Sequence, residues 1–170
     1  YGADLSAGHA VIVKSVRQRR EVESTVEWDA AADGNNAAFQ ALADRLRKET
    51  DAGQALVGAA MPVHELFTRW LQTPLSSADK ARKVLPSLLD IQLPFPLETC
   101  AYFFPRFRRA GNAVDGLAVA ARHDDIQRRI ATYRQAGLDP ALLDHEGLAL
   151  WTQSLRELPL QCSLNAAMSI

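Results

Sequence analysis

The apolar residues of this chain follow two periods, one typical of strands and one typical of helices. In the first thirty residues, valines separated by even numbers indicate half-buried strands: Val11, Val13, Val22 and Val26. Polar breaks at 6–8 and 17–20 divide this part into a predicted three-stranded meander. Helical spacing then predicts a helix over 39–53, and the continuous apolar run at 55–61 predicts a strand covered on both faces.

The middle of the chain contains prolines that limit its helices. Residues 63–71 fit both periods, and we expect one turn followed by a strand. Ser76 and Asp79 have the spacing of a capping box at the start of a helix. Because Pro86 lies inside this helix and lacks a backbone N–H, we expect a kink or a break near Leu85.

The second half of the chain is predicted to form a hairpin and further mixed elements. Strands at 99–107 and 117–121 should pair antiparallel across a polar loop at 109–116. A helix closed by Gly137 follows, and then a short strand, a last helix and a strand at 160–170. The order βββαβ, then βαββα, then strand, helix and strand predicts an α/β protein with a mixed sheet.

The composition is that of an ordinary globular protein. Hydrophobic residues make up 48% and charged residues 23% of the 170 positions, which excludes a mainly disordered chain. Because 19 basic residues face 20 acidic ones, counterion release provides little drive for binding nucleic acid. The apolar runs are too short for a membrane span, so we expect no direct membrane insertion. Two cysteines, Cys100 and Cys162, favour a reducing compartment.

Residues that could carry catalysis or hold a metal are scattered. The histidines form no H-x-x-x-H pair, so no metal site is predicted: His9, His64, His123 and His145. There is no G-x-S-x-G motif, and neither cysteine has a histidine within two residues, so no catalytic residue is predicted. His123 and His145 lie beside carboxylates, and we interpret both as helix-entry residues.

The first hairpin turn is the candidate phosphate site. In such a turn, backbone N–H groups point at phosphate oxygens, a glycine permits close approach, and a carboxylate can reach a metal ion through water. Asp4, Ser6 and Gly8 are the candidate residues. The chain has no G-x-x-x-x-G-K-[ST] loop, and a plain hairpin is the alternative interpretation.

Two long segments carry a resemblance to a known family. Residues 67–98 read FTRWLQTPLSSADKARKVLPSLLDIQLPFPLE, and residues 117–151 read LAVAARHDDIQRRIATYRQAGLDPALLDHEGLALW. Together with the opening Gly-Ala-Asp-Leu, they resemble the actin-like ATPase superfamily. The resemblance is specifically to the PilM-type proteins of type IV pilus assembly and to the cytoplasmic domain of GspL-type proteins of type II secretion.

The resemblance implies an actin-like, ribonuclease H-like subdomain with an inserted lobe. Residues 1–62 plus 139–170 would form the first subdomain, and residues 63–138 would form the inserted βαββα lobe. In complete relatives a second half supplies the other wall of a cleft for ATP and Mg²⁺, so we expect no cofactor in this fragment. The first loop departs from the family pattern because Ser6 replaces a glycine and Val11 stands where a basic residue is expected.

The function implied by the resemblance is that of a cytoplasmic scaffold with a degenerate nucleotide site. Its partners would be proteins of an inner-membrane assembly complex, and the resemblance also allows a homodimer. A proline-stiffened corner loses little entropy on binding, which makes one segment the candidate partner contact: Leu93, Pro94, Phe95 and Pro96. The alternative interpretation of this corner is that Phe95 packs into the core of the lobe itself. The alternatives are an ATP-binding or ATP-hydrolysing protein, complete in the full-length chain, and a free-standing α+β binding domain unrelated to actin.

Overall fold

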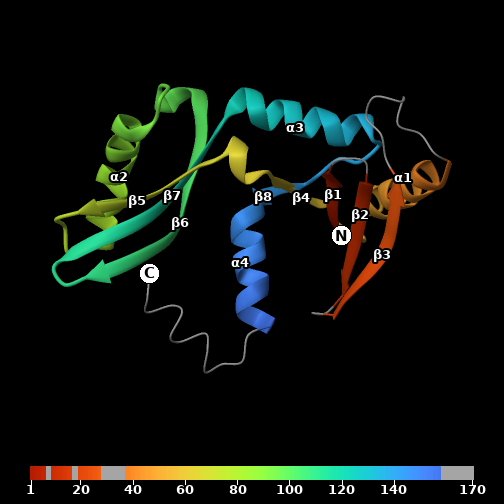
Figure 1. Ribbon diagram of the computed structural model, residues 1–170, viewed down its shortest axis with the longest axis horizontal. Coiled ribbons are helices and arrows are strands. Elements are labelled where there is room, and N and C mark those ends of the chain that lie inside the picture. Colours follow the sequence, from red (N-terminus) through yellow and green to blue (C-terminus); the bar gives the residue numbers. More distant parts are fainter. Residues whose placement is uncertain (7–8, 17–18, 28–36, 158–170) are drawn as a thin grey trace. The chain divides into compact units, whose positions relative to one another are not determined.

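The computed structural model describes residues 1–6, 9–16, 19–27 and 37–157. The chain divides into two compact units, of which unit 1 comprises 1–62 and the chain from 132 onward, and unit 2 comprises 63–131 (Figure 1). The return to unit 1 therefore lies at Thr132, before the expected Asp139. The physical reason is that Tyr133 is fully buried in the core of unit 1.

Unit 1 is built on a five-stranded mixed sheet of order β3-β2-β1-β4-β8. The strands are β1 (Gly2–Ser6), β2 (His9–Val16), β3 (Arg19–Glu27), β4 (Gly58–Met61) and β8 (Leu142–His145). The first three pair antiparallel, which confirms the predicted meander, whereas β4 pairs parallel with both β1 and β8. Helix α4 (Glu146–Glu157) follows β8. The strand expected at 160–170 lies outside the described residues.

The core of unit 1 joins the sheet to helix α1 (Ala37–Asp51) and to the end of α3 (His123–Gln135). Leu46 and Ile12 are fully buried, and the buried Tyr133 hydroxyl donates to the Ala3 carbonyl at 3.1 Å. That hydrogen bond satisfies the single polar atom that Tyr133 carries into the apolar interior. One hydrophobic core therefore contains side chains from the β1–β2 hairpin, from α1 and from the end of α3.

Glycines end α1 and α3 as the sequence predicts. Gly53 and Gly137 adopt positive φ angles of 68° and 77°, which the absence of a Cβ permits. At α1, the amides of Gly53 and Gln54 donate back to the carbonyls of the last helical turn at 2.9 Å each. Gly137 and Leu138 do the same at α3, so both helices end in Schellman motifs.

Tyr1, which precedes β1, is hydrogen-bonded to α1. Its hydroxyl donates to Glu49 Oε2 at 2.8 Å, and its backbone nitrogen donates to the Leu56 carbonyl at 2.7 Å. Burial raises the pKa of the Tyr1 phenol, and the adjacent Glu49 carboxylate raises it further. The neutral phenol is therefore the form that the folded chain holds.

Unit 2 is a three-stranded antiparallel sheet of order β5-β7-β6 with helix α2 against one face (Figure 1). After a 3₁₀ turn at Val63–Glu65, its elements are β5 (Phe67–Thr73), α2 (Ala78–Gln92), a 3₁₀ turn at Leu97–Thr99, β6 (Cys100–Ala110), β7 (Ala113–Arg122) and the start of α3. This is the expected βαββα order, and the turn before β5 is the one that the ambiguous pattern at 63–71 predicts.

Two local predictions for unit 2 are wrong, and a third is wrong in part. The N-cap of α2 is Ser77 rather than Ser76, and its side chain makes no capping hydrogen bond. Helix α2 continues through Pro86, so the predicted break is wrong, while the predicted kink stays a prediction. The carbonyl that loses its partner belongs to Arg82, an exposed residue. The predicted loop is also too long, since the strands extend to a tight turn at Gly111 and Asn112.

Gly116 tests the packing of α2 on the sheet. A Cβ built on Gly116 would lie 2.7 Å from Leu85 Cδ1 and 3.6 Å from the Phe104 ring. Since Leu85 is fully buried, it has little room to move aside. We expect Gly116→Ala to lower the free energy of unfolding by about 1–3 kcal/mol in urea denaturation. Gly2→Ala is the control, because nothing lies within 4 Å of a Cβ at that position. Equal stability of the two variants would contradict this packing.

Candidate functional site

Ser6, the last described residue before the predicted phosphate turn, lies at the carboxyl edge of the parallel strands in unit 1. Strands β1, β4 and β8 run in the same direction, so Ser6, Met61 and His145 end at one edge of the sheet. Ligands of open α/β sheets usually bind outside the carboxyl ends of such strands. The hairpin joining β1 to β2 is therefore at the edge where the implied nucleotide would bind.

Two of the three candidate phosphate-binding residues, Asp4 and Ser6, lie in strand β1. Asp4 is exposed, whereas its neighbours Ala3 and Leu5 are buried in the core. Asp4 pairs across the hairpin with Val11, so an aliphatic side chain lies beside it on the same face of the sheet. Ser6 ends the strand and pairs with His9. Gly8 lies outside the described residues.

Lys14 is the nearest described basic residue along β2, and its ammonium lies over a ring. Its Nζ is 5.5 Å from the centre of the Tyr1 ring, a cation–π contact at the amino end of β1. Ser6 is at the opposite end of that strand. The structure therefore places the Lys14 head group at the edge away from the candidate phosphate turn.

His145 has a structural role at the same carboxyl edge. It is 5% exposed, and its Nδ1 accepts a hydrogen bond from the Leu148 amide at 3.3 Å in the first turn of α4. This contact satisfies one of the free amides at the start of the helix. His145 is thus a helix-entry residue, as interpreted from the sequence.

The predicted partner corner alternates between inward and outward residues. Pro94 and Pro96 are exposed, whereas Leu93 and Phe95 are half-buried. The Phe95 ring meets Phe67 edge to face at 4.8 Å, and the Arg122 guanidinium lies 5.7 Å from the centre of the same ring. Leu93 packs against the core cluster under α2. The corner can therefore offer its prolines to a partner while its apolar side chains hold the unit together.

A feature that the sequence did not predict is an aromatic surface on the sheet face opposite α2. Cross-strand partners share a face, and Gly116 faces α2, so Leu117 and Val119 point to the other face. Trp70 pairs with Leu117 and Phe103 pairs with Val119, and these aromatic residues are 43% and 47% exposed. We call this face, with the arginines described next, the aromatic face.

The polar end of the aromatic face contains a buried carboxylate. Asp115 is 2% exposed and accepts a hydrogen bond at 3.0 Å through Oδ2 from Arg108 Nη2, while Oδ1 has no partner. The Arg108 guanidinium also lies 5.4 Å from the centre of the Trp70 ring. Arg106, which pairs with Leu117, is exposed on the same face. Arg106 and Arg108 thus border an apolar surface, and the Asp115 carboxylate on this face is hydrogen-bonded to Arg108.

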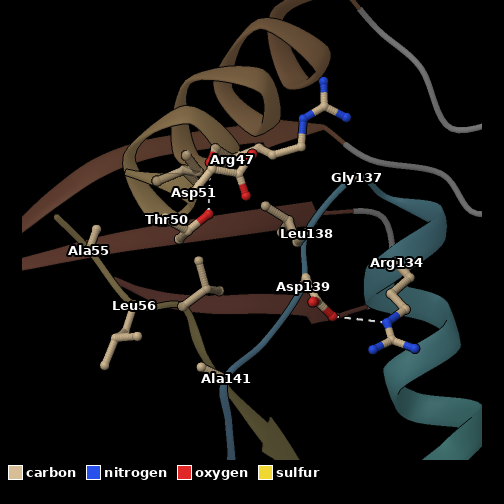
Figure 2. Close-up of a pocket in the computed structure, with 12 residues that line it drawn as sticks. Arg47, Thr50, Asp51, Ala55, Leu56, Arg134, Gly137, Leu138, Asp139 and Ala141 are labelled. Atoms are coloured by element: carbon tan, nitrogen blue, oxygen red, sulfur yellow. Dashed lines mark hydrogen bonds and ion pairs between the residues drawn. The ribbon is translucent and has the colours of Figure 1, made fainter. Parts of the chain in front are cut away.

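Unit 1 contains a pocket at the amino edge of its parallel strands, opposite the phosphate turn. Its volume is about 570 Å³, and it lies between the end of α1, the segment before β4 and the segment between α3 and β8 (Figure 2). Buried apolar residues form part of its lining, namely Leu46, Val57 and Leu138. Sequence patterns could not reveal it, because its walls come from three segments far apart in the chain.

The described residues contain neither a metal cluster nor a helix that could span a membrane. In the part of the chain that the structure describes, no three histidine, cysteine or carboxylate side chains gather as a metal site would require. Within the same residues, every helix is too short or too polar to cross a membrane.

Comparisons with known proteins identify the fold. No family model and no curated protein matches the sequence. A chain of the PilM–PilN type IV pilus biogenesis complex matches with a TM-score of 0.59 and 21% identity, over 93% of this chain and 51% of that one. The cytoplasmic domain of EpsL, an inner membrane component of the type II secretion system of Vibrio cholerae, matches with a TM-score of 0.53 and 16% identity, over 84% and 56%.

These matches confirm the expected architecture. The chain has the PilM/GspL-type fold, with a mixed sheet and an inserted βαββα lobe, that the sequence resemblance implied. It spans about half the length of each matched structure.

Arg108 tests whether the buried carboxylate depends on its partner. Removing Arg108 leaves Asp115 in an apolar site without a charge-assisted hydrogen bond. Because Arg108 itself is half exposed, we expect Arg108→Ala to cost about 1–2 kcal/mol of unfolding free energy, and Asp115→Ala in the same chain to restore part of it. Arg47→Ala is the control, since Arg47 and Asp44 form an exposed pair worth about 0–0.5 kcal/mol. Additive effects of the two substitutions would show that the pair contributes nothing.

Proposed function

We propose that this chain is an assembly component of a pilus or type II secretion machine, which acts at the cytoplasmic side of the inner membrane by binding other proteins. The observation that carries the proposal is the shared fold with one component of each kind of machine. The absence of a metal cluster among the described residues is compatible with a docking role, and the proposal does not depend on it.

The aromatic face of unit 2 supports a docking role. Exposed aromatic residues and arginines dominate binding energy in many protein interfaces. Trp70 and Phe103 each retain more than two fifths of their surface exposed, beside Arg106 and Arg108. A partner segment with an apolar residue for the rings and an acidic residue for the arginines would fit this face.

The corner of residues 93–96 offers a second contact. Prolines restrict the unbound corner, so binding there would order few additional residues. The exposed Pro94 and Pro96 are the accessible side chains, while Phe95 packs on Phe67. The partner-binding role of Leu93, Pro94, Phe95 and Pro96 stays a prediction, and replacing the two prolines tests it without removing the Phe95 packing.

We further propose that the nucleotide site is degenerate. Phosphate binding needs backbone donors and positive charge, yet Val11 faces Asp4 across the hairpin and Lys14 extends over Tyr1. The chain spans about half of each matched structure, so Asp4, Ser6 and Gly8 would line at most one wall of a cleft. ATP and Mg²⁺ binding by the full-length protein is the alternative function.

The docking prediction concerns the aromatic face. We expect Trp70→Ser with Phe103→Ser to reduce pull-down of the cytoplasmic segments of the machine's inner-membrane proteins at least about tenfold, because truncating interface aromatics commonly costs more than 1 kcal/mol each. The matched control is Val84→Ser with Ile91→Ser on α2, whose side chains are also exposed. Circular dichroism spectra equal to that of the unsubstituted chain would show that both variants are folded. Equal loss in both, or unchanged capture, would contradict a docking role for this face.

The nucleotide prediction is tested by calorimetry. We expect titration of this chain with ATP and Mg²⁺ to show no binding tighter than the millimolar range, because Asp4, Ser6 and Gly8 would line only one wall of the proposed cleft. Asp4→Asn should leave the result unchanged. Micromolar binding that Asp4→Asn weakens would overturn the degenerate site and favour the ATP-dependent alternative.

A further inference from the structure

The pocket of unit 1 does not include the described residues of the phosphate turn of the same unit. It lies at the amino ends of the parallel strands, where Tyr1, Val57 and Ala141 meet, and not at the carboxyl ends that bear the phosphate turn. Its volume of about 570 Å³ is within the range of about 300–1,000 Å³ that is usual for ligand pockets. The pocket is therefore large enough for a whole side chain with part of its backbone.

Among the charged residues that line this pocket, both arginines form an ion pair with a carboxylate, and one aspartate forms none with any described residue. Arg47 binds Asp44 at 2.8 Å, and Arg134 binds Asp139 at 2.9 Å, so both lining arginines already have a carboxylate. Asp51, the remaining charged residue of the lining, has no such partner among the described residues. Figure 2 shows the Arg47 guanidinium pointing away from Leu138 and Ala141.

The dipoles of two helices make the electrostatic potential at this pocket more negative. Asp51 is the last residue of α1, and Arg134 lies in the last turn of α3, so two helix C-termini border the pocket. Each helix C-terminus carries a partial negative charge that favours cations and disfavours a carboxylate such as Asp51. A cation bound beside Asp51 would relieve this repulsion.

The accessible apolar part of the lining is suited to an aliphatic chain. Ala55 and Ala141 offer apolar surface to a ligand, whereas Leu46, Val57 and Leu138 are at most 2% exposed and form the buried layer behind it. Leu56, at the border of the pocket, is 71% exposed, which leaves a large apolar side chain available to a second residue of a ligand. Lysine combines an aliphatic stem with a compact cation.

We infer that this pocket binds a lysine side chain presented by a protein segment, with its stem on the apolar lining, its ammonium beside Asp51 and a neighbouring apolar residue on Leu56. The inference does not rest on the proposed function, because it concerns unit 1 and a different residue set. A free alkylamine shares the ammonium chemistry, and the experiment below separates it from the peptide.

The test is an NMR titration of the full 170-residue chain with three acetylated and amidated pentapeptides. They are Gly-Leu-Lys-Leu-Gly and its analogues with norleucine or glutamate in place of lysine. We expect the lysine peptide to shift the amide signals of Ala55, Leu56 and Gly137, with about threefold tighter binding than norleucine, as befits one exposed charge pair. Added salt should weaken the lysine peptide and leave the norleucine peptide unchanged.

Variants and a small amine complete the design. Asp51→Asn should remove the threefold preference for lysine, whereas Asp79→Asn, which removes one exposed charge from α2 in unit 2, should preserve it. Pentylamine binding as tightly as the peptide would overturn the protein segment as ligand. Preference for glutamate would show that Arg47 and Arg134 govern the pocket and would overturn the inference. Absence of signal shifts at Leu56 with all three peptides at millimolar concentration would do so as well.

Discussion

The parallel pairing of β4 with β1 and with β8 is the constraint on which the organisation of unit 1 depends. Parallel strands cannot be joined by a tight turn and need a crossover. Here α1 and its flanking segments connect β3 to β4, and in the sequence the inserted unit 2 comes between β4 and β8. Because the three strands run the same way, their two ends differ. The carboxyl edge carries the β1–β2 hairpin and His145, and the amino edge carries the pocket.

The two faces of the unit 2 sheet also differ, because α2 covers only one of them. Gly116 lets Leu85 of α2 approach the central strand, so one face of the sheet is filled by a helix. On the other face, Leu117 and Val119 are buried in the middle strand while Trp70 and Phe103 on the edge strands remain half exposed. The Arg108–Asp115 pair fixes one end of that face, since Arg108 contacts both the carboxylate and the Trp70 ring. An ordered arginine on an aromatic ring loses less entropy on binding than a freely rotating one.

Much of the fold is predictable from the sequence because local signals and tertiary packing agree. Even spacing of valines predicts the meander, and Gly53 and Gly137 predict helix ends that the structure realises as Schellman motifs. The failures occur where a neighbouring group changes the local rule. Pro86 stays within α2, where the carbonyl that loses its partner belongs to the exposed residue Arg82. The β6–β7 loop is only Gly111 and Asn112, because longer strands gain ladder hydrogen bonds.

The candidate sites are harder to predict from the sequence than the secondary structure is. Asp4 and Ser6 could be proposed because they adjoin one turn, whereas the aromatic face combines residues from three strands and the pocket combines three distant segments. Such surfaces are defined by strand register and helix ends, which periodicity does not give. The described residues bring together apolar surface bordered by single charges, a combination that protein interfaces use for recognition, and this is what the proposed docking role is built on.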